Sequence, residues 1–186
     1  ELEYSYQSFR NKCEELSGML ADAGIVAGDK VAVLAQNMPN WTVAFFTGVA
    51  FGRIAVPILP ESSENEVTNI LKHSESKALF VSRKLLSNVS DETMDGLDVV
   101  IDIESFEFIK TPARAMKKAG ADSLCATGHG CTSAETSRPD DIATIIYTSG
   151  TTGNAKGVML SHRNLASCVM SCYASRKRDE HDRWLS

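Results

Sequence analysis

A ten-residue loop, Thr148 to Gly157, constrains this chain more than any other segment. It contains three glycines, four hydroxyl side chains and one lysine, and it lies between two apolar runs, 142–147 and 158–160. Glycine accepts positive φ values, so the backbone can turn sharply and leave amide N–H groups pointing outward. Hydroxyls add small hydrogen-bond donors, and Lys156 adds a positive charge on a flexible stem. The pattern predicts a strand, a phosphate-binding loop and a second strand.

Two other interpretations of this loop fit its residues less well. Gly, Ser and Thr also fill ordinary surface hairpins, but the length of the loop, its lack of Pro, Asp and Glu, and its lysine favour phosphate binding. The Walker pattern G-x-x-x-x-G-K-[ST] can be aligned from Gly150 to Lys156. Ala155 then replaces its second glycine, and Gly157 replaces its metal-binding hydroxyl. A Walker loop also opens a helix, whereas an apolar strand follows here.

The segments before the loop alternate between helical and extended patterns. Apolar residues recur at helical spacing from Phe9 to Ala23, and Ser5 can cap that helix. A second helix is expected over 41–51, where apolar residues lie nearly all round, so we expect it to be buried. A capping box at Ser63 and Glu66 predicts a third. Continuous apolar runs predict buried strands at 31–34, 54–57 and 78–81, and a fourth strand is expected at 97–101.

This alternation with short connections predicts an α/β fold: a wound, mostly parallel sheet with helices on both faces. The stretch 104–141 shows no clear periodicity, and within it 123–137 is rich in Gly, Ser, Thr and Ala. We expect that richer part to be an irregular excursion before the strand that leads into the loop.

Charge and cysteine content exclude several classes of protein. The formal net charge of the 186 residues is −5, and the absence of a long basic run argues against binding to nucleic acid. No run of about 18 apolar residues occurs, so no membrane span is expected. Five cysteines without paired C-x-x-C units favour a reducing, cytoplasmic compartment over a disulfide framework. An acidic protein must hold a polyanion locally, with backbone amides and a few cations.

Residues 147–162 resemble the AMP-binding signature of the adenylate-forming enzymes, which include acyl-CoA synthetases, luciferases and the adenylation domains of peptide synthetases. The stretch reads Tyr-Thr-Ser-Gly-Thr-Thr-Gly-Asn-Ala-Lys-Gly-Val-Met-Leu-Ser-His. Residues 4–9 resemble the opening helix of that superfamily, 51–57 its Val-Pro strand, and 183–186 the start of its acid-pocket segment. The ending Gly-Val-Met-Leu-Ser-His and the long excursion before the loop are most similar to long-chain fatty acyl-CoA synthetases.

The resemblance implies a reaction in two steps. A carboxylic acid attacks the α-phosphate of Mg-ATP to give an acyl-adenylate and pyrophosphate, and a thiol, usually coenzyme A, then takes the acyl group. The implied cofactors are ATP, Mg²⁺ and coenzyme A. Thr148 is implied as the hydroxyl nearest the magnesium. The implied ligands of the β- and γ-phosphates are Thr148, Ser149, Gly150, Thr151, Thr152, Gly153 and Lys156.

One position departs from the family pattern. Ala155 stands where the family commonly has a proline before the loop lysine. Proline would fix its own φ and bias Asn154 toward an extended shape. Alanine leaves the loop freer, while the contacts made by the rest of the loop are still expected.

The resemblance also implies that residues 1–186 are a partial N-terminal AMP-binding domain from a longer chain. The magnesium-binding Glu, the ribose-binding Asp, the hinge and the catalytic Lys of the family would all lie beyond Ser186. We therefore expect no catalytic residue in this chain, and we expect the isolated fragment to be inactive. The expected partners are a small carboxylic acid, ATP, coenzyme A and the remainder of the chain. Two alternatives stay open: adenylation of an aryl or amino acid, and a nucleotide-binding module without turnover.

Overall fold

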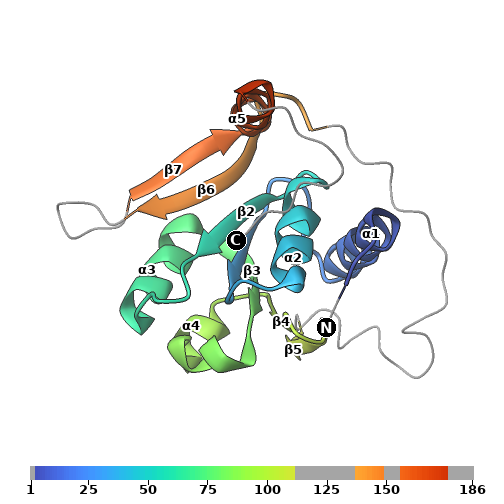
Figure 1. Cartoon of the computed structure of the whole chain (residues 1–186). Coiled ribbons are helices and arrows are strands. Elements are labelled where there is room, and N and C mark those ends of the chain that lie inside the picture. The colour runs from blue at the N-terminus through green and yellow to red at the C-terminus, as the bar shows by residue number, and fades with distance from the viewer. Residues whose placement is uncertain (1–2, 112–136, 149–155, 176–186) are drawn as a thin grey trace.

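The computed structural model describes residues 3–111, 137–148 and 156–175, which form a seven-stranded sheet flanked by helices (Figure 1). The helices are α1 (Tyr6–Asp22), α2 (Pro39–Val49), α3 (Glu64–Ser74), α4 (Asp91–Asp95) and α5 (His162–Ser175), with a 3₁₀ helix η1 (Arg83–Asn88). The strands are β1 (Lys30–Leu34), β2 (Ile54–Ile58), β3 (Ser76–Val81), β4 (Val99–Asp102), β5 (Phe108–Lys110), β6 (Ile142–Thr148) and β7 (Lys156–Ser161).

The strand order, β5-β4-β3-β1-β2-β6-β7, confirms the wound and mostly parallel sheet. The five strands from β4 to β6 in this order run parallel, and β5 and β7 pair antiparallel at the two edges. Helices α2 and α3 connect β1 to β2 and β2 to β3. Because β1 to β4 and β6 share one direction, their carboxyl ends lie along the same edge of the sheet.

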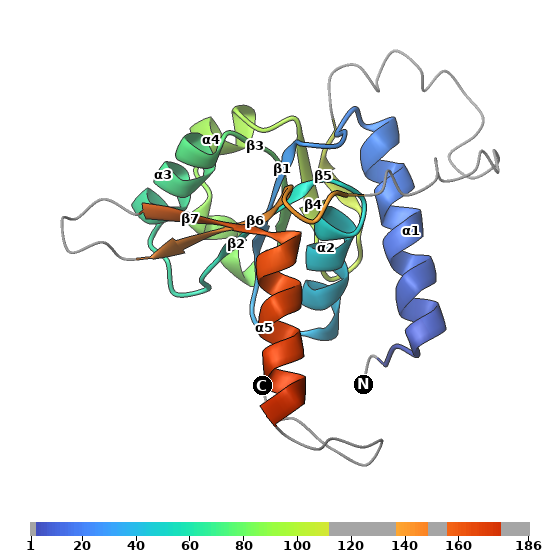
Figure 2. The same cartoon turned by 90° about the horizontal axis from the view of Figure 1, so that it is seen from above.

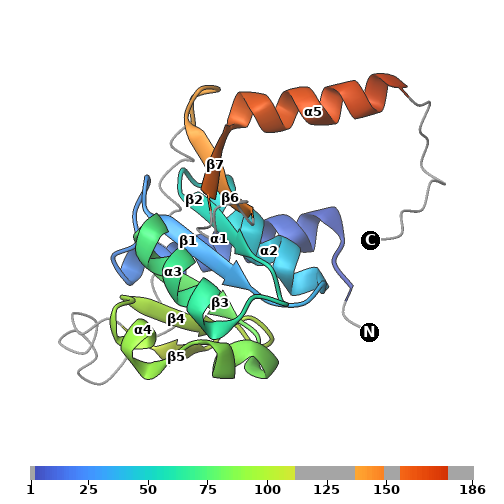
Figure 3. The same ribbon diagram turned by 90° about the vertical axis from the view of Figure 1, so that its left-hand side faces the viewer.

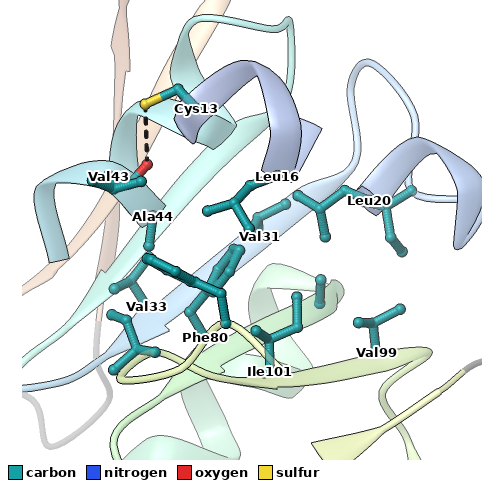
Figure 4. Close-up of a cluster of buried hydrophobic side chains, with 14 of the residues drawn as sticks. Cys13, Leu16, Leu20, Val31, Val33, Val43, Ala44, Phe80, Val99 and Ile101 are labelled. Atoms are coloured by element: carbon teal, nitrogen blue, oxygen red, sulfur yellow. Dashed lines mark hydrogen bonds between the residues drawn. The ribbon is translucent and has the colours of Figure 1, made fainter. Parts of the chain in front are cut away.

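Alternate residues of each central strand pack on opposite faces of the sheet. Val31 and Val33 of β1 lie in a cluster with α1 and α2, while Ala32 and Leu34 lie in a second cluster with α3. Figure 4 shows the first cluster, where the Cys13 Sγ also donates to the Val43 carbonyl at 3.7 Å. Figure 2 shows α1 and α2 on one side of the strands and α3 and α4 on the other. Burial on both faces explains why these strands are continuously apolar in the sequence.

The helix ends follow the predicted capping residues closely. The Ser5 side chain accepts a hydrogen bond from the Ser8 amide, and Ser63 and Glu66 form the complete capping box. Helix α2 begins at Pro39, two residues before the predicted start, with proline in the first helical turn. These local interactions fix where α1 and α3 begin, and hence how each packs on the sheet.

One expectation from the sequence is wrong in part, and one strand was not predicted. Helix α2 is not buried on all sides: Val43 and Ala44 are fully buried, but Phe46 is 43% exposed. An outer-layer helix covers the sheet with one face only, and the Phe46 ring instead meets the rings of Phe9 and Phe45 edge to face. The stretch 104–141 also contains a strand, β5, which the sequence did not reveal. Its three residues are too few for a pattern, and their pairing with β4 defines them.

Arg53 is a buried cation that joins the end of α1 to the start of β2. The residue is 3% exposed, and its guanidinium donates to the Ile25 carbonyl twice, at 2.8 and 3.0 Å. It also donates to the Ser17 hydroxyl at 2.9 Å and to the Ser17 carbonyl at 3.1 Å. Burial lowers the pKa of Arg53 from its usual value. In the 51–57 segment, Arg53 therefore has a structural role.

We expect Arg53→Met to lower the free energy of unfolding by about 2–4 kcal/mol, because the carbonyls of Ile25 and Ser17 would stay buried without this donor. Urea unfolding followed by circular dichroism measures the loss. Arg10→Met is the matched control, since Arg10 is exposed and pairs with Glu14 within one helix. Equal stability of the two variants would contradict the structural role of Arg53.

Candidate functional site

The two strands predicted on either side of the loop are present as β6 and β7, which together are called the hairpin. The two strands pair antiparallel in a register that runs from Ile142 opposite Ser161 to Thr148 opposite Lys156. Thr148 and Lys156 are therefore the last cross-strand pair before the loop, and both are exposed. The remaining predicted phosphate ligands lie outside the described residues, so their roles stay predictions: Ser149, Gly150, Thr151, Thr152 and Gly153.

The hairpin places Thr148 at the carboxyl edge of the sheet. Strand β6 pairs parallel with β2, with Thr144 opposite Ala55. Thr148 ends β6 and therefore lies at the edge where β1 to β4 also end. Open α/β sheets bind their ligands outside the carboxyl ends of the strands, because loops and helix N-termini converge there. The loop lysine thus lies at the edge of the sheet where a ligand is expected.

Thr144 anchors the beginning of the hairpin to the sheet. Thr144 and its neighbour Ala143 are buried, and the Thr144 hydroxyl donates to the Ala55 carbonyl at 2.8 Å. At the other end of β7, the Ser161 hydroxyl accepts from the Asn164 amide at 3.2 Å, and the Asn164 side chain accepts from the Ser161 amide at 2.9 Å. This reciprocal cap turns the chain from β7 directly into α5.

Tyr147, one residue before Thr148, contacts a helix that is distant in sequence. Its hydroxyl lies 2.7 Å from Nδ1 of His73 in the last turn of α3, and the two rings meet edge to face with centroids 5.7 Å apart. Burial raises the pKa of the Tyr147 phenol, so the hydroxyl is protonated at neutral pH. Sequence reasoning missed His73, because nothing in the local pattern links residues 74 positions apart.

Gly157 gives the Tyr147 ring its space. Gly157 is the cross-strand partner of Tyr147. A methyl group at position 157 would lie 2.9 Å from Cγ2 of Ile145 and 3.2 Å from Cζ of Tyr147. Both distances are shorter than an ordinary contact between carbon atoms. The glycine after the loop lysine is therefore required by packing against these two side chains.

A hollow of about 660 Å³ lies at the opposite end of the strands, and its lining includes neither Thr148 nor Lys156. Its lining includes Gly28, Gly52, Asp140 and His162, all close to strand starts or to the start of α5. Arg163 binds Asp140 through two hydrogen bonds of 2.8 and 3.1 Å, which lower the pKa of that carboxyl. The lining of the hollow around Asp140 is held by this ion pair. It is separate from the end of the hairpin that carries Thr148 and Lys156.

The described part of the chain shows neither a cluster of metal ligands nor a helix that could cross a membrane. Within residues 3–111, 137–148 and 156–175, no three His, Cys, Asp or Glu side chains are grouped as metal ligands. The expected magnesium contact of Thr148 involves a hydroxyl and phosphate oxygens, so it stays a prediction. In the same ranges, none of the helices combines the length and apolar character that crossing a bilayer requires.

The sequence matches the family described as AMP-binding enzyme over residues 2–186. The Bacillus subtilis protein YdaB, named as an acyl–CoA ligase, is 30% identical over 184 residues, and human long-chain-fatty-acid–CoA ligase 1 is 28% identical over 200 aligned positions. The alignments cover 98% and 96% of this chain but only 35% and 27% of the relatives. The chain thus spans about a third of the length of these relatives.

A solved structure shares the fold. O-succinylbenzoate coenzyme A synthetase from Bacillus subtilis, determined in complex with AMP, superimposes with a TM-score of 0.75 at 23% identity. The match covers 99% of this chain and 43% of that structure. The wound sheet with its edge hairpin therefore corresponds to one part of a larger known fold.

We expect Gly157→Ala to lower the free energy of unfolding by about 1–3 kcal/mol, because the added methyl group must displace Ile145 or Tyr147. Thermal and urea unfolding measure the change. Gly18→Ala in α1 is the matched control, since a methyl group there meets nothing within 4 Å and alanine favours a helix. A Gly157→Ala variant as stable as Gly18→Ala would show that the described packing around Gly157 is wrong.

Proposed function

Because this chain belongs to the AMP-binding enzyme family, we propose that it is the part of an adenylate-forming ligase that holds the phosphates of ATP. In the whole protein, a carboxylic acid attacks the α-phosphate, pyrophosphate leaves, and coenzyme A then takes the acyl group from the adenylate. The observation that carries this proposal is the β6–β7 hairpin, which presents Thr148 opposite Lys156 at the carboxyl edge of the sheet.

The residues at the hairpin end suit a polyphosphate. The Lys156 ammonium supplies a positive charge to the β- and γ-phosphates and balances the charge that develops on the leaving pyrophosphate. The Thr148 hydroxyl donates to a phosphate oxygen or offers an oxygen to Mg²⁺, the ligand type that this ion prefers. Magnesium bound there would neutralise phosphate charge. Loop amides, hydroxyls and one lysine make a local cationic site in a chain whose formal net charge is −5.

A long-chain fatty acid is the acid that we propose. This choice is supported by the name of the human relative and by the resemblance of residues 157–162 to long-chain synthetases. At 28–30% identity, an aryl or amino acid is the alternative substrate. A nucleotide-binding module without turnover is the alternative from another class. A magnesium-binding Glu and a C-terminal catalytic Lys in the parent polypeptide would separate an enzyme from such a module.

Exposed apolar side chains on β7 and α5 support the proposal that residues 1–186 are one piece of a larger enzyme. Figure 3 shows α5 as the outermost element on this side of the sheet. Five large side chains on these two elements are between 46% and 67% exposed: Val158, Met159, Val169, Met170 and Tyr173. We infer that later residues of the same polypeptide cover them and supply the catalytic groups. The isolated fragment would then be inactive and bind ATP weakly.

Acid-dependent exchange of pyrophosphate into ATP tests this function on the complete parent polypeptide. We expect long-chain fatty acids to drive exchange above the level without acid, and aryl and amino acids to do so poorly. Exchange driven only by an aryl or amino acid would keep the reaction and replace the substrate. No exchange with any acid would contradict the proposed function.

We expect Lys156→Ala in the parent polypeptide to reduce exchange by about 10–100-fold, since a charge-assisted hydrogen bond contributes roughly 1.5–3 kcal/mol. Its unfolding midpoint should stay close to that of the unmodified protein, because Lys156 is exposed. Lys84→Ala is the control, as Lys84 is an exposed lysine of η1. Equal exchange rates in the two variants would remove Lys156 from the mechanism.

A further inference from the structure

The end of the hairpin that carries Thr148 and Lys156 extends away from its anchor on the sheet. The parallel ladder with β2 is registered at Ala55 and Thr144, near the beginning of β6. Beyond that point Ile146 is 39% exposed, and β7 is the outermost strand of the described sheet. Figures 1 and 2 both show the end of the hairpin where β6 finishes and β7 begins, and this end lies beside α3. A contact with α3 is therefore well placed to fix this end.

Tyr147 makes that contact. Apart from the Ser161–Asn164 cap that leads β7 into α5, two side-chain hydrogen bonds of the described residues join the hairpin to other elements: Thr144 to the Ala55 carbonyl, and Tyr147 to His73. They lie at opposite ends of β6. The Tyr147 ring, together with Ile145, also packs against the apolar cluster that includes Val67 and Leu71 of α3. The hairpin is thus held at its start by the sheet and near its loop by a helix.

The position of His73 follows from α3 itself. His73 lies in the last turn of the helix, where the Glu75 amide donates to the carbonyls of Leu71 and Lys72. The Ser74 hydroxyl lies 2.7 Å from that of Ser76, the first residue of β3. Leu71 and Ser74 are buried, whereas the His73 side chain is exposed except for its contact with Tyr147. The His73 side chain contributes little to the core. Packing in the core therefore does not explain its contact with the Tyr147 ring.

We propose that His73 is a positioning residue: through Tyr147 it sets the placement of Thr148 and Lys156 for a phosphate ligand. This inference rests on the proposed function of the hairpin. His73 acts on the tyrosine hydroxyl through Nδ1, and Gly157 leaves the tyrosine ring room to reach it. Loss of the contact releases the hairpin end while the core stays intact, so the effect falls on the binding of phosphates.

Two conservative substitutions of His73 separate the effect of its hydrogen bond to Tyr147 from the effect of its side-chain volume. Asparagine places its amide group near the position of Nδ1, whereas glutamine places its amide group near that of Nε2. His73→Asn can keep the hydrogen bond to Tyr147, and His73→Gln cannot keep it in the same geometry. Tyr147→Phe removes only the hydroxyl. Steady-state exchange kinetics on the parent polypeptide, with KM measured separately for ATP and for the acid, provide the readout.

We expect His73→Gln, His73→Ala and Tyr147→Phe to raise the KM for ATP about five-fold, the effect of one net hydrogen bond. The KM for the acid should stay within about two-fold of the unmodified value, and His73→Asn should behave like the unmodified protein. The double variant His73→Ala/Tyr147→Phe should be no worse than either single variant, because both remove the same interaction. Indistinguishable Asn and Gln variants, or parallel losses for ATP and acid, would overturn the proposal.

A second assay keeps this inference distinct from the proposed function. If the parent polypeptide shows no exchange with any acid, the function fails, and pyrophosphate binding measured by titration calorimetry then decides the role of His73. We expect the unmodified protein and His73→Asn to bind pyrophosphate alike, and the Gln and Ala variants to bind it about five-fold more weakly. Equal affinities for all four proteins, or no binding by any of them, would overturn it.

Discussion

The parallel pairing of β6 with β2 is the interaction on which the candidate site depends. Ala55 lies opposite Thr144, and the Thr144 hydroxyl donates to the Ala55 carbonyl at 2.8 Å. Strand β2 is itself fixed by β1 and by Arg53 at its start. Because β6 runs in the same direction as its neighbours in the sheet, the end of the hairpin that carries Thr148 and Lys156 lies at the carboxyl edge. An antiparallel β6 would place the lysine at the other end of the sheet.

The arrangement at that edge concerns the electrostatics of binding an anion to an acidic chain. In the proposed function, a chain with a formal net charge of −5 holds a polyanion, and it can do so only where donors and cations are concentrated. The hairpin brings a hydroxyl and an ammonium group together as the last pair of a regular ladder. Sites supported by strands are more precise than sites on loops alone. The contact between Tyr147 and His73 extends that support from the sheet to α3.

Much of this architecture could be predicted from the sequence, because short apolar runs, capping serines and the glycine-rich loop are local signals. The central strands, the Ser5 and Ser63 caps and both strands of the hairpin follow from them. The missed features depend on distant contacts: β5 exists through its pairing with β4, and α2 leaves Phe46 exposed because only one of its sides faces the sheet. The roles of Arg53 and His73 were missed for the same reason. The phosphate-binding roles of Thr148, Lys156 and the residues between them stay predictions.

The central claim is that the β6–β7 hairpin binds the phosphates of ATP. Amide hydrogen exchange of the parent polypeptide, measured with and without Mg-ATP and resolved for peptides spanning 142–161, tests it most directly. The account predicts slower exchange on nucleotide binding, concentrated around Thr148–Gly157 and lost in Lys156→Ala, with the core strands β1 and β3 unchanged. Protection elsewhere in the protein, with unchanged exchange in the hairpin, would show that another segment binds the phosphates.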